Sequence, residues 1–317
     1  MRWGIAGYGD IVTRRVLPAL RSLGEEPVAL WGRDAHRAAR TAERYGVAVS
    51  GTDQAVLLSG VDAVYVATPV VRHVPFARAV LAAGLPVLVE KPLAGALDAG
   101  APLDVARRCA GVAYYRRLAP AVRRLREELR DWTPERVEVR FRCAFAPGPA
   151  DPMRWRSEPA VSGGGVLADA GSHRIDLLLH LFGRPQEVTA ALGRRFPGGA
   201  ERRAEVVLRW RSGLRAHLLA EWSEEPPTDR FELTGEGRTV TLDPLDSGRV
   251  EGIEAAPLVL PPEANPHRPL LADFVRAAAS GGTPVCPVPE ARLVDEVIVA
   301  AGRSHASGCR PVRPWGN

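Results

Sequence analysis

The sequence predicts an α/β fold in two parts: a doubly wound parallel sheet, followed by an α+β domain with a mainly antiparallel, open-faced sheet. Over residues 1–116, short continuous apolar runs alternate with helical patterns, which is typical of parallel strands covered by helices on both faces. From residue 117 onward, several segments alternate apolar and polar residues, which is typical of half-buried strands. We therefore expect one domain over 1–116 and a second over 117–317, with a late helix that could pack back on the first.

In the first domain, apolar runs predict the strands and helical periodicity predicts the segments between them. The strands are expected near 3–6, 28–31, 63–67, 86–89 and 112–115. The helices are expected near 10–22, 35–45, 74–83 and 104–109.

The second domain opens with a charged helix near 121–130, and a strictly alternating strand follows at 137–145. One helix is expected over 163–182, after a run of three glycines. The remaining strands are expected near 186–196, 204–211, 214–222, 228–235 and 238–243, and the last helices near 268–280 and 289–306.

Composition excludes several classes of protein. The net charge of +5 comes from 42 basic and 37 acidic residues that are interspersed, so we expect no nucleic-acid partner. No apolar run approaches the roughly 20 residues of a membrane span, and residues 1–6 do not read as a secretory signal. The 4 cysteines lack CxxC spacing, which predicts reduced thiols in the cytoplasm and no metal site.

A glycine-rich turn, Gly-Ile-Ala-Gly-Tyr-Gly over residues 4–9, joins the first strand to the first helix. Gly7 and Gly9 would let a pyrophosphate approach backbone N–H groups, and Asp10 and Ile11 open the helix whose N-terminus would face it. The turn therefore predicts a dinucleotide site, although such a turn can also simply open a helix in any α/β protein.

The end of the second strand bears on the choice of cofactor. Gly32 stands where an acidic residue would hold the ribose hydroxyls of NAD, and Arg33 follows it. An arginine there can pair with a 2′-phosphate, so NADP(H) is favoured over NAD(H). The alternative is that Arg33 is a solvated loop residue and Asp34 caps the next helix.

Two later strands end in polar residues that should lie at the carboxyl edge of the sheet, where ligands bind. Thr68 and Pro69 follow one strand, with His73 close behind, and Glu90 and Lys91 follow the next. We expect all five to contact the cofactor, although His73 could equally well be a residue that starts a helix.

Lys91 is the only lysine in the chain; the other 41 basic residues are arginine. Arginine is bulky and stays protonated, whereas lysine is a compact charge whose proton can be lost on burial. Its retention at this edge predicts a catalytic role, with chance as the alternative.

Titratable side chains recur at helical spacing in the second domain. Asp169, His173 and Asp176 fall at i, i+4 and i+7, which places them on one face of the expected helix. A carboxylate next to an imidazole can orient it for acid–base chemistry. A metal site is less favoured because glycines precede the helix, and a solvated helix face is the other alternative.

Together these residues resemble the Gfo/Idh/MocA oxidoreductases. The similar segments, in family order, are Gly4-x-x-Gly7-x-Gly9, Ala67-Thr68-Pro69 with His73, Glu90-Lys91-Pro92, Tyr114-Tyr115-Arg116, Trp155-Arg156, and Gly163-Gly164-Gly165 before Asp169-x-x-x-His173. The resemblance implies that Lys91, Asp169 and His173 are catalytic. It also implies a Rossmann domain and a second domain that binds substrate and forms a homodimer or homotetramer through its open sheet. Two positions depart from the family: Val70 replaces a usual asparagine, and Val12 a usual small residue.

The expected activity is hydride transfer between NAD(P) and a carbon that bears a secondary alcohol or ketone on a sugar, cyclitol or related polyol. Alternatives are a keto-sugar or imine reductase in natural-product biosynthesis and a non-catalytic NAD(P)-sensing regulator on the same fold. The weaker candidates for substrate contacts are Tyr115, Arg116, Arg154, Trp155 and Asp176.

Overall fold

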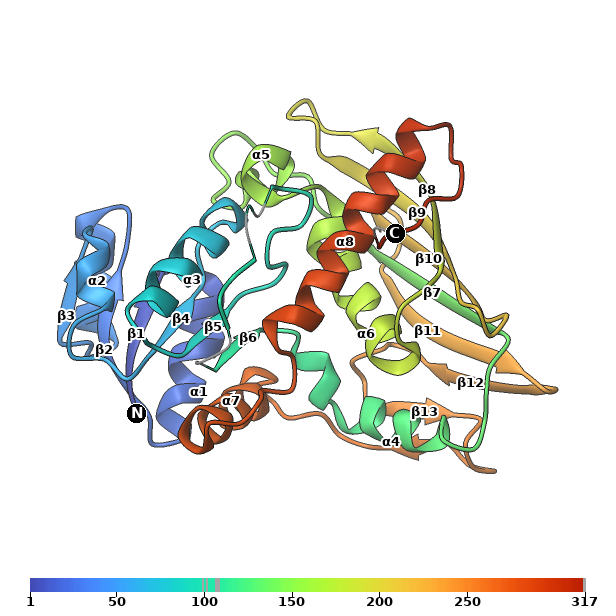
Figure 1. Ribbon diagram of the computed structural model, residues 1–317, viewed down its shortest axis with the longest axis horizontal. Helices are drawn as coiled ribbons and strands as arrows, with labels where there is room; N and C mark the ends of the chain where they lie inside the picture. Colours follow the sequence, from blue (N-terminus) through green and yellow to red (C-terminus); the bar gives the residue numbers. More distant parts are fainter. Residues whose placement is uncertain (99, 101, 106–108, 316–317) are drawn as a thin grey trace. The chain divides into compact units, whose positions relative to one another are not determined.

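The computed structural model describes residues 1–98, 100, 102–105 and 109–315, and the chain divides into two compact units (Figure 1). The N-terminal unit is built from Met1–Ala94, Asp98–Tyr115 and Glu263–Ala291. The C-terminal unit is built from Gly95–Leu97, Arg116–Pro262 and Arg292–Asn317. Each unit has its own sheet, as the predicted fold class requires, and that class is confirmed.

The N-terminal unit contains a six-stranded parallel sheet in the order β3-β2-β1-β4-β5-β6. Strands β1, β4 and β5 are buried along almost their whole length, which explains their continuous apolar character. The order reverses beside β1, and this switch point is where doubly wound sheets bind ligands. The strands are β1 (Arg2–Ala6), β2 (Glu26–Trp31), β3 (Val49–Gly51), β4 (Ala63–Val66), β5 (Val87–Val89) and β6 (Ala110–Val112).

The helices of the N-terminal unit are α1 (Leu17–Ser22), α2 (Ala35–Arg44), α3 (His73–Ala82) and α7 (His267–Ser280). A π-helical turn at Val12–Val16 precedes α1. Helix α7 comes from the late segment of the chain and packs against α1, and its Phe274 ring lies 5.7 Å from the ring of Trp3.

A strand and a helix are expected near the end of the parallel sheet. The bounds predicted for the strand at 112–115 are wrong: β6 is Ala110–Val112, and Tyr115 begins a 3-10 turn. Tyrosines favour strands, but the pairing of β5 with β6 ends at Val89 and Val112. The Ala113 N–H still donates to the Val89 carbonyl oxygen at 2.8 Å, and Tyr114 and Tyr115 lie beyond the end of β5. The helix expected near 104–109 falls partly on 106–108, which lie outside the described residues.

The C-terminal unit contains an eight-stranded sheet in the order β14-β13-β12-β11-β7-β10-β9-β8. Only the β7–β10 pair is parallel among its seven neighbour pairs. The strands are β7 (Arg136–Cys143), β8 (Glu187–Arg195), β9 (Glu201–Arg209), β10 (Arg215–Trp222), β11 (Thr228–Gly235), β12 (Arg238–Leu242), β13 (Arg249–Glu251) and β14 (Leu258–Val259).

The helices of this unit are α4 (Pro120–Glu128), α5 (Pro159–Ser162), α6 (Ser172–Phe182) and most of α8 (Val288–Ala306). Helices α6 and α8 cover one face of the sheet (Figure 1). Arg174 of α6 lies over the Phe141 ring of β7 at 4.1 Å, and Ser304 of α8 accepts a hydrogen bond from the Ala190 N–H of β8. No helix among the described residues covers the other face, so the sheet is open on that side.

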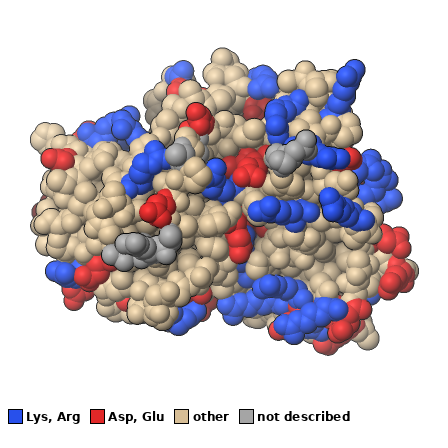
Figure 2. Space-filling model, viewed as in Figure 1, with Lys and Arg blue, Asp and Glu red and all other residues tan. Residues whose placement is uncertain are grey.

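No helix within the described ranges is both long and apolar enough to cross a membrane. Basic and acidic side chains are interspersed on the face shown in Figure 2, as they are along the sequence.

Candidate active site

The turn after β1 is built around Gly7. Its φ is +119°, and a Cβ there would lie 2.5 Å from the carbonyl oxygen of Ala67, so no side chain fits. A Cβ on Gly9 would meet nothing within 4 Å, so the backbone there is open. The helix begins at Asp10, which is exposed, and continues through the half-buried Ile11. This combination of a glycine-only turn, open space and a helix N-terminus fits the pyrophosphate of a dinucleotide.

The two glycines are expected to differ when each is replaced by alanine. Gly7→Ala should lower the melting temperature of the cofactor-free protein by about 5 °C, because a positive φ and the clash with Ala67 together cost roughly 2 kcal/mol. Gly9→Ala is the matched control: it should leave the melting temperature within about 1 °C, yet weaken cofactor binding about tenfold. Thermal unfolding and fluorescence titration measure both effects. Equal melting temperatures would contradict the constraint at Gly7.

At the end of β2, Gly32 is held free of a side chain by Tyr8: a Cβ on Gly32 would lie 2.0 Å from the Tyr8 ring. The Arg37 guanidinium lies 4.8 Å from the same ring. Asp34 caps α2, because its Oδ1 accepts the Arg37 N–H at 2.9 Å, and this bond lowers the pKa of the carboxyl group. Arg33 is exposed. Asp34 therefore has the helix-capping role given above as an alternative. Position 32 has no carboxylate that could bind the ribose hydroxyls, and the Tyr8 ring leaves no room for one.

The loops after β4 and β5 lie at one edge because these two strands are neighbours in a parallel sheet. His73 ties the loops together: Nδ1 lies 2.8 Å from the Pro92 carbonyl oxygen and Nε2 lies 2.8 Å from that of Thr68. Burial lowers the pKa of this imidazole, and a neutral ring donates to only one of the two oxygens. His73 is 1% exposed, so it positions these loops rather than offering its ring to a ligand. The edge itself carries Thr68, Pro69 and the half-buried Lys91.

In the C-terminal unit, the single regular helix expected over 163–182 is wrong at its start. Gly163–Gly165 form a bend, Leu167–Gly171 form a π-helical turn, and only then does α6 begin. Asp169 lies in the π-turn and His173 lies in the first turn of α6, where it is 7% exposed. Because π-turns hydrogen-bond i to i+5, the spacing rule for an α-helix does not hold across this junction.

The buried carboxylate of Glu201, on β9, holds the start of this helix. It accepts the N–H of Gly165 at 2.9 Å and that of Leu167 at 3.1 Å. Burial raises the pKa of Glu201, although these bonds oppose the shift. A Cβ on Gly165 would lie 2.1 Å from the Glu201 carbonyl oxygen, which explains the glycine at this position.

Asp169 has a partner that the sequence did not indicate. Arg156 Nη1 lies 3.3 Å from Asp169 Oδ2, and the Arg156 guanidinium lies 5.6 Å from the Trp155 ring. Trp155 is half-buried, whereas Arg154 is exposed and bonds only weakly to the Pro149 carbonyl oxygen at 3.4 Å. Trp155 is therefore linked through Arg156 to the carboxylate of Asp169.

Asp176 does not share the surroundings of Asp169. Its side chain is 1% exposed and pairs with Arg117, itself 2% exposed, at 2.7 Å. The Arg117 Nε lies 3.1 Å from both carboxylate oxygens. Asp176 is thus part of a buried ion pair, which is a structural role, and the expected polar stripe is divided between two environments.

Two other weak candidates lie in different units. Arg116, in the C-terminal unit, is 8% exposed and binds Asp246 through two hydrogen bonds of 2.9 and 2.5 Å. Tyr115, in the N-terminal unit, is half-buried, and its ring lies 5.3 Å from that of His267. No group of three or more His, Cys, Asp or Glu side chains suited to a metal ion occurs within the described ranges.

Sequence reasoning missed several residues that shape these sites. Tyr8 stands between two glycines of the turn, a position that could have drawn attention to it. Arg156 is adjacent to a candidate residue and has an opposite charge to Asp169. His267 and Tyr65 gave no signal, because only the fold brings them beside the Glu90 loop.

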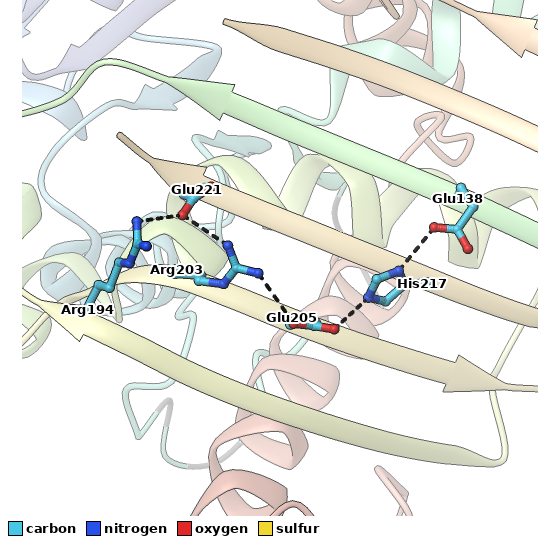
Figure 3. Close-up of polar contacts among 6 residues, drawn as sticks. All are labelled: Glu138, Arg194, Arg203, Glu205, His217 and Glu221. Carbon is cyan, nitrogen blue, oxygen red and sulfur yellow. Dashed lines mark hydrogen bonds and ion pairs between the residues drawn. The ribbon is translucent and has the colours of Figure 1, made fainter. Parts of the chain in front are cut away.

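The open face of the C-terminal sheet carries a connected polar network (Figure 3). His217 lies 3.0 Å from Glu138 and 3.1 Å from Glu205. Glu221 accepts hydrogen bonds from Arg194 at 3.2 Å and from Arg203 at 3.1 Å, and Arg203 also lies 3.6 Å from Glu205. The network spans four strands and satisfies charges on a face that no helix among the described residues covers.

Comparison with known proteins agrees with the fold. Residues 1–114 match a family described as an oxidoreductase family with an NAD-binding Rossmann fold, and residues 133–241 match the GFO/IDH/MocA C-terminal domain. The first match makes the N-terminal unit that of a nicotinamide-dependent oxidoreductase. The chain belongs to the Gfo/Idh/MocA family, so the resemblance drawn from its motifs is confirmed.

Among its relatives is dTDP-3,4-didehydro-2,6-dideoxy-alpha-D-glucose 3-reductase of Streptomyces antibioticus, 31% identical over 95% of this chain and 97% of the relative. Another is D-xylose 1-dehydrogenase (NADP(+)) 2 of Haloferax volcanii, 28% identical over 97% of this chain and 98% of the relative. Levoglucosan dehydrogenase in complex with NADH has the same fold, with a TM-score of 0.87, 20% identity and full coverage of both chains.

Proposed function

We propose that the protein interconverts a secondary alcohol and a ketone on a sugar, cyclitol or related polyol with NAD(P)(H). The observation that carries this proposal is that the chain's only lysine lies at the ligand-binding edge of the parallel sheet. The names of two relatives, a xylose dehydrogenase and a reductase of a dTDP-linked keto-sugar, support a sugar substrate. The second name also favours the alternative of a keto-sugar reductase in natural-product biosynthesis.

The nicotinamide would supply or accept the hydride, and the side chains would hold the substrate and manage its proton. Lys91, as a cation beside the substrate oxygen, would stabilise the negative charge that develops there. His173 would give a proton to that oxygen or take it away, because an imidazole ring can act as both donor and acceptor. Asp169, held by Arg156 at 3.3 Å, would orient His173 and the substrate hydroxyls.

The test is steady-state turnover in both directions. NADPH and NADH oxidation would be followed with a panel of keto-sugars and inososes, and NADP⁺ and NAD⁺ reduction with sugars and cyclitols. We expect turnover with at least one member of either panel. Tight cofactor binding without turnover of any member would instead support a cofactor-sensing regulator.

NADP(H) preference is part of the proposal. It rests on the exposed Arg33 beside a position, Gly32, that offers no carboxylate to the ribose. Arg33→Ala should weaken NADPH binding about tenfold and leave NADH binding unchanged, because only NADPH has a 2′-phosphate to pair with. Arg40→Ala on the exposed side of α2 is the control. Fluorescence titration measures both affinities, and equal wild-type affinity for the two cofactors would refute the preference.

We also propose that two copies pair through the open face of the C-terminal sheet. The strand register aligns residues of neighbouring strands in rows that run across the sheet. One row, called the acidic row, contains Glu138 and Glu232 beside His217, and the adjacent basic row contains Arg140 and Arg230. A twofold axis in the interface and parallel to these rows would set the acidic row of one copy on the basic row of the other. An axis along the strands would instead set each row on itself, where like charges repel.

This mode of pairing predicts a charge-reversal pattern. Glu138→Arg should dissociate the oligomer, and Glu138→Arg combined with Arg140→Glu should restore it, because the exchange preserves the opposition of the rows. Sedimentation velocity at low and high salt measures the populations. A monomeric wild type, or a double variant no more associated than the single one, would contradict the proposal.

A cytoplasmic location completes the proposal. None of the four cysteines, all of which the structure describes, forms a disulfide, which suits a reducing compartment. Cell fractionation with a tagged full-length chain tests it.

A further inference from the structure

A buried carboxylate stands beside the only lysine of the chain. Glu90 is 9% exposed, at the end of β5, and its Oε1 accepts the Tyr65 hydroxyl of β4 at 2.6 Å. The same oxygen lies 3.2 Å from Nε2 of His267, the first residue of α7. The other oxygen accepts the backbone N–H of Lys91 at 3.3 Å. Glu90 thus joins the lysine to two residues far from it in sequence.

His267 is itself firmly held. It is 1% exposed, its ring lies 5.3 Å from that of Tyr115, and its backbone N–H donates to Asn265 Oδ1 at 3.1 Å. Asn265 in turn donates to the Arg15 carbonyl oxygen at 2.8 Å, within the π-helical turn Val12–Val16 that follows the glycine turn. The start of α7 therefore links the Glu90 loop to the phosphate-binding helix within one unit.

The charges of this cluster are complementary. Burial on its own raises the pKa of Glu90, but the hydrogen bond and charge of His267, the Tyr65 hydroxyl and the Lys91 charge outweigh it, and the net shift is downward. Burial and the nearby Glu90 charge raise the pKa of Tyr65 well above its usual range, so the phenol keeps its proton and remains a donor. Glu90 is consequently an anion beside the lysine at neutral pH.

We propose that His267 and Tyr65 are positioning residues for Lys91. They hold the Glu90 carboxylate in one place, and Glu90 fixes the backbone that carries the lysine. On the far side, His73 contacts the Pro92 carbonyl oxygen at 2.8 Å, so the loop is held from both ends. His267, at the start of α7, thereby helps to fix the position of Lys91 at the edge of the parallel sheet. This inference rests on the catalytic role proposed for Lys91.

The single lysine makes a direct test feasible, because ¹³Cε-lysine labelling yields one side-chain signal that needs no assignment. His267→Phe keeps an aromatic ring against Tyr115 and removes the donor to Glu90. We expect kcat to fall about 10²-fold with KM for cofactor and substrate within about threefold, since misplacing a reacting group by ~1 Å costs that much. The lysine signal should move toward its position in the unfolded chain.

Two further variants sharpen the test. Tyr65→Phe removes one oxygen and retains the buried ring, so it can be measured even if His267→Phe does not fold, and it should change kcat and the signal in the same direction. His267→Gln restores an N–H donor and should recover part of kcat. His36→Phe, at an exposed site on α2, is the control.

The outcomes separate this inference from the proposed function. If His267→Phe and Tyr65→Phe lower only the melting temperature, with kcat and the lysine signal unchanged, the cluster is purely structural and the inference is wrong. If instead Lys91→Arg retains full turnover while the signal still moves in these variants, the catalytic role of Lys91 is wrong and the positioning remains.

Discussion

Lys91→Arg should lower kcat by about 10²–10⁴-fold while cofactor affinity stays within about threefold. The substitution keeps the positive charge, but a guanidinium is planar, larger and permanently protonated. It can neither approach the substrate oxygen as a point charge nor pass on a proton. Steady-state kinetics with the best substrate of the panel, together with fluorescence titration of the cofactor, separate turnover from binding.

The control for this variant is Arg40→Lys, which introduces a second lysine at an exposed site on α2 and should leave kcat unchanged. A Lys91→Arg enzyme with near-normal kcat would remove the lysine from the mechanism. It would also show that the single lysine is an accident of an arginine-rich composition.

Asp176→Ala should destabilise the protein by about 3–5 kcal/mol, because it removes the carboxylate that pairs with the buried Arg117 charge. Both side chains are nearly inaccessible, at 1% and 2% exposure, and Arg117 contacts both carboxylate oxygens. The measurement is thermal unfolding together with the yield of folded protein. For the fraction that folds, kcat and KM should be close to wild type.

A double variant provides the internal check. Asp176→Leu with Arg117→Met replaces both charges by apolar groups of similar size and should recover most of the lost stability. If Asp176→Ala instead keeps its melting temperature and raises KM, then Asp176 is the substrate contact that the sequence suggested.

The strands of both sheets could be predicted wherever burial left a periodic pattern. In β4 every residue is buried, and in β7 Val137 and Val139 alternate with more exposed residues, so the two kinds of sheet were distinguishable. The short strands β3, β13 and β14 were missed because each has at most one buried residue, so no apolar run marks them. The π-turn at Leu167–Gly171 was also missed, since an extra residue in a helical turn has no sequence signature.

The site residues could be predicted to the extent that they stand next to glycines or at strand ends. Gly7 and Lys91 were found for that reason. The partners that complete the site, such as Arg156 and His267, come from distant segments and depend on tertiary contacts. Asp176 was placed with Asp169 by helical spacing alone. That spacing cannot predict the buried ion pair of Asp176 with Arg117, because it does not depend on tertiary contacts.

Helix α7 has a consequence for how the chain folds as it is synthesised. Leu270, Leu271 and Phe274 of α7 are at most 2% exposed within a unit whose first strand begins at Arg2. A ribosome must therefore translate at least as far as Ser280 before the N-terminal unit acquires helix α7 and Glu90 acquires its contact with His267. The N-terminal unit is therefore still incomplete when most of the C-terminal unit has been synthesised. The N-terminal unit cannot reach its final fold before the C-terminal unit begins to fold.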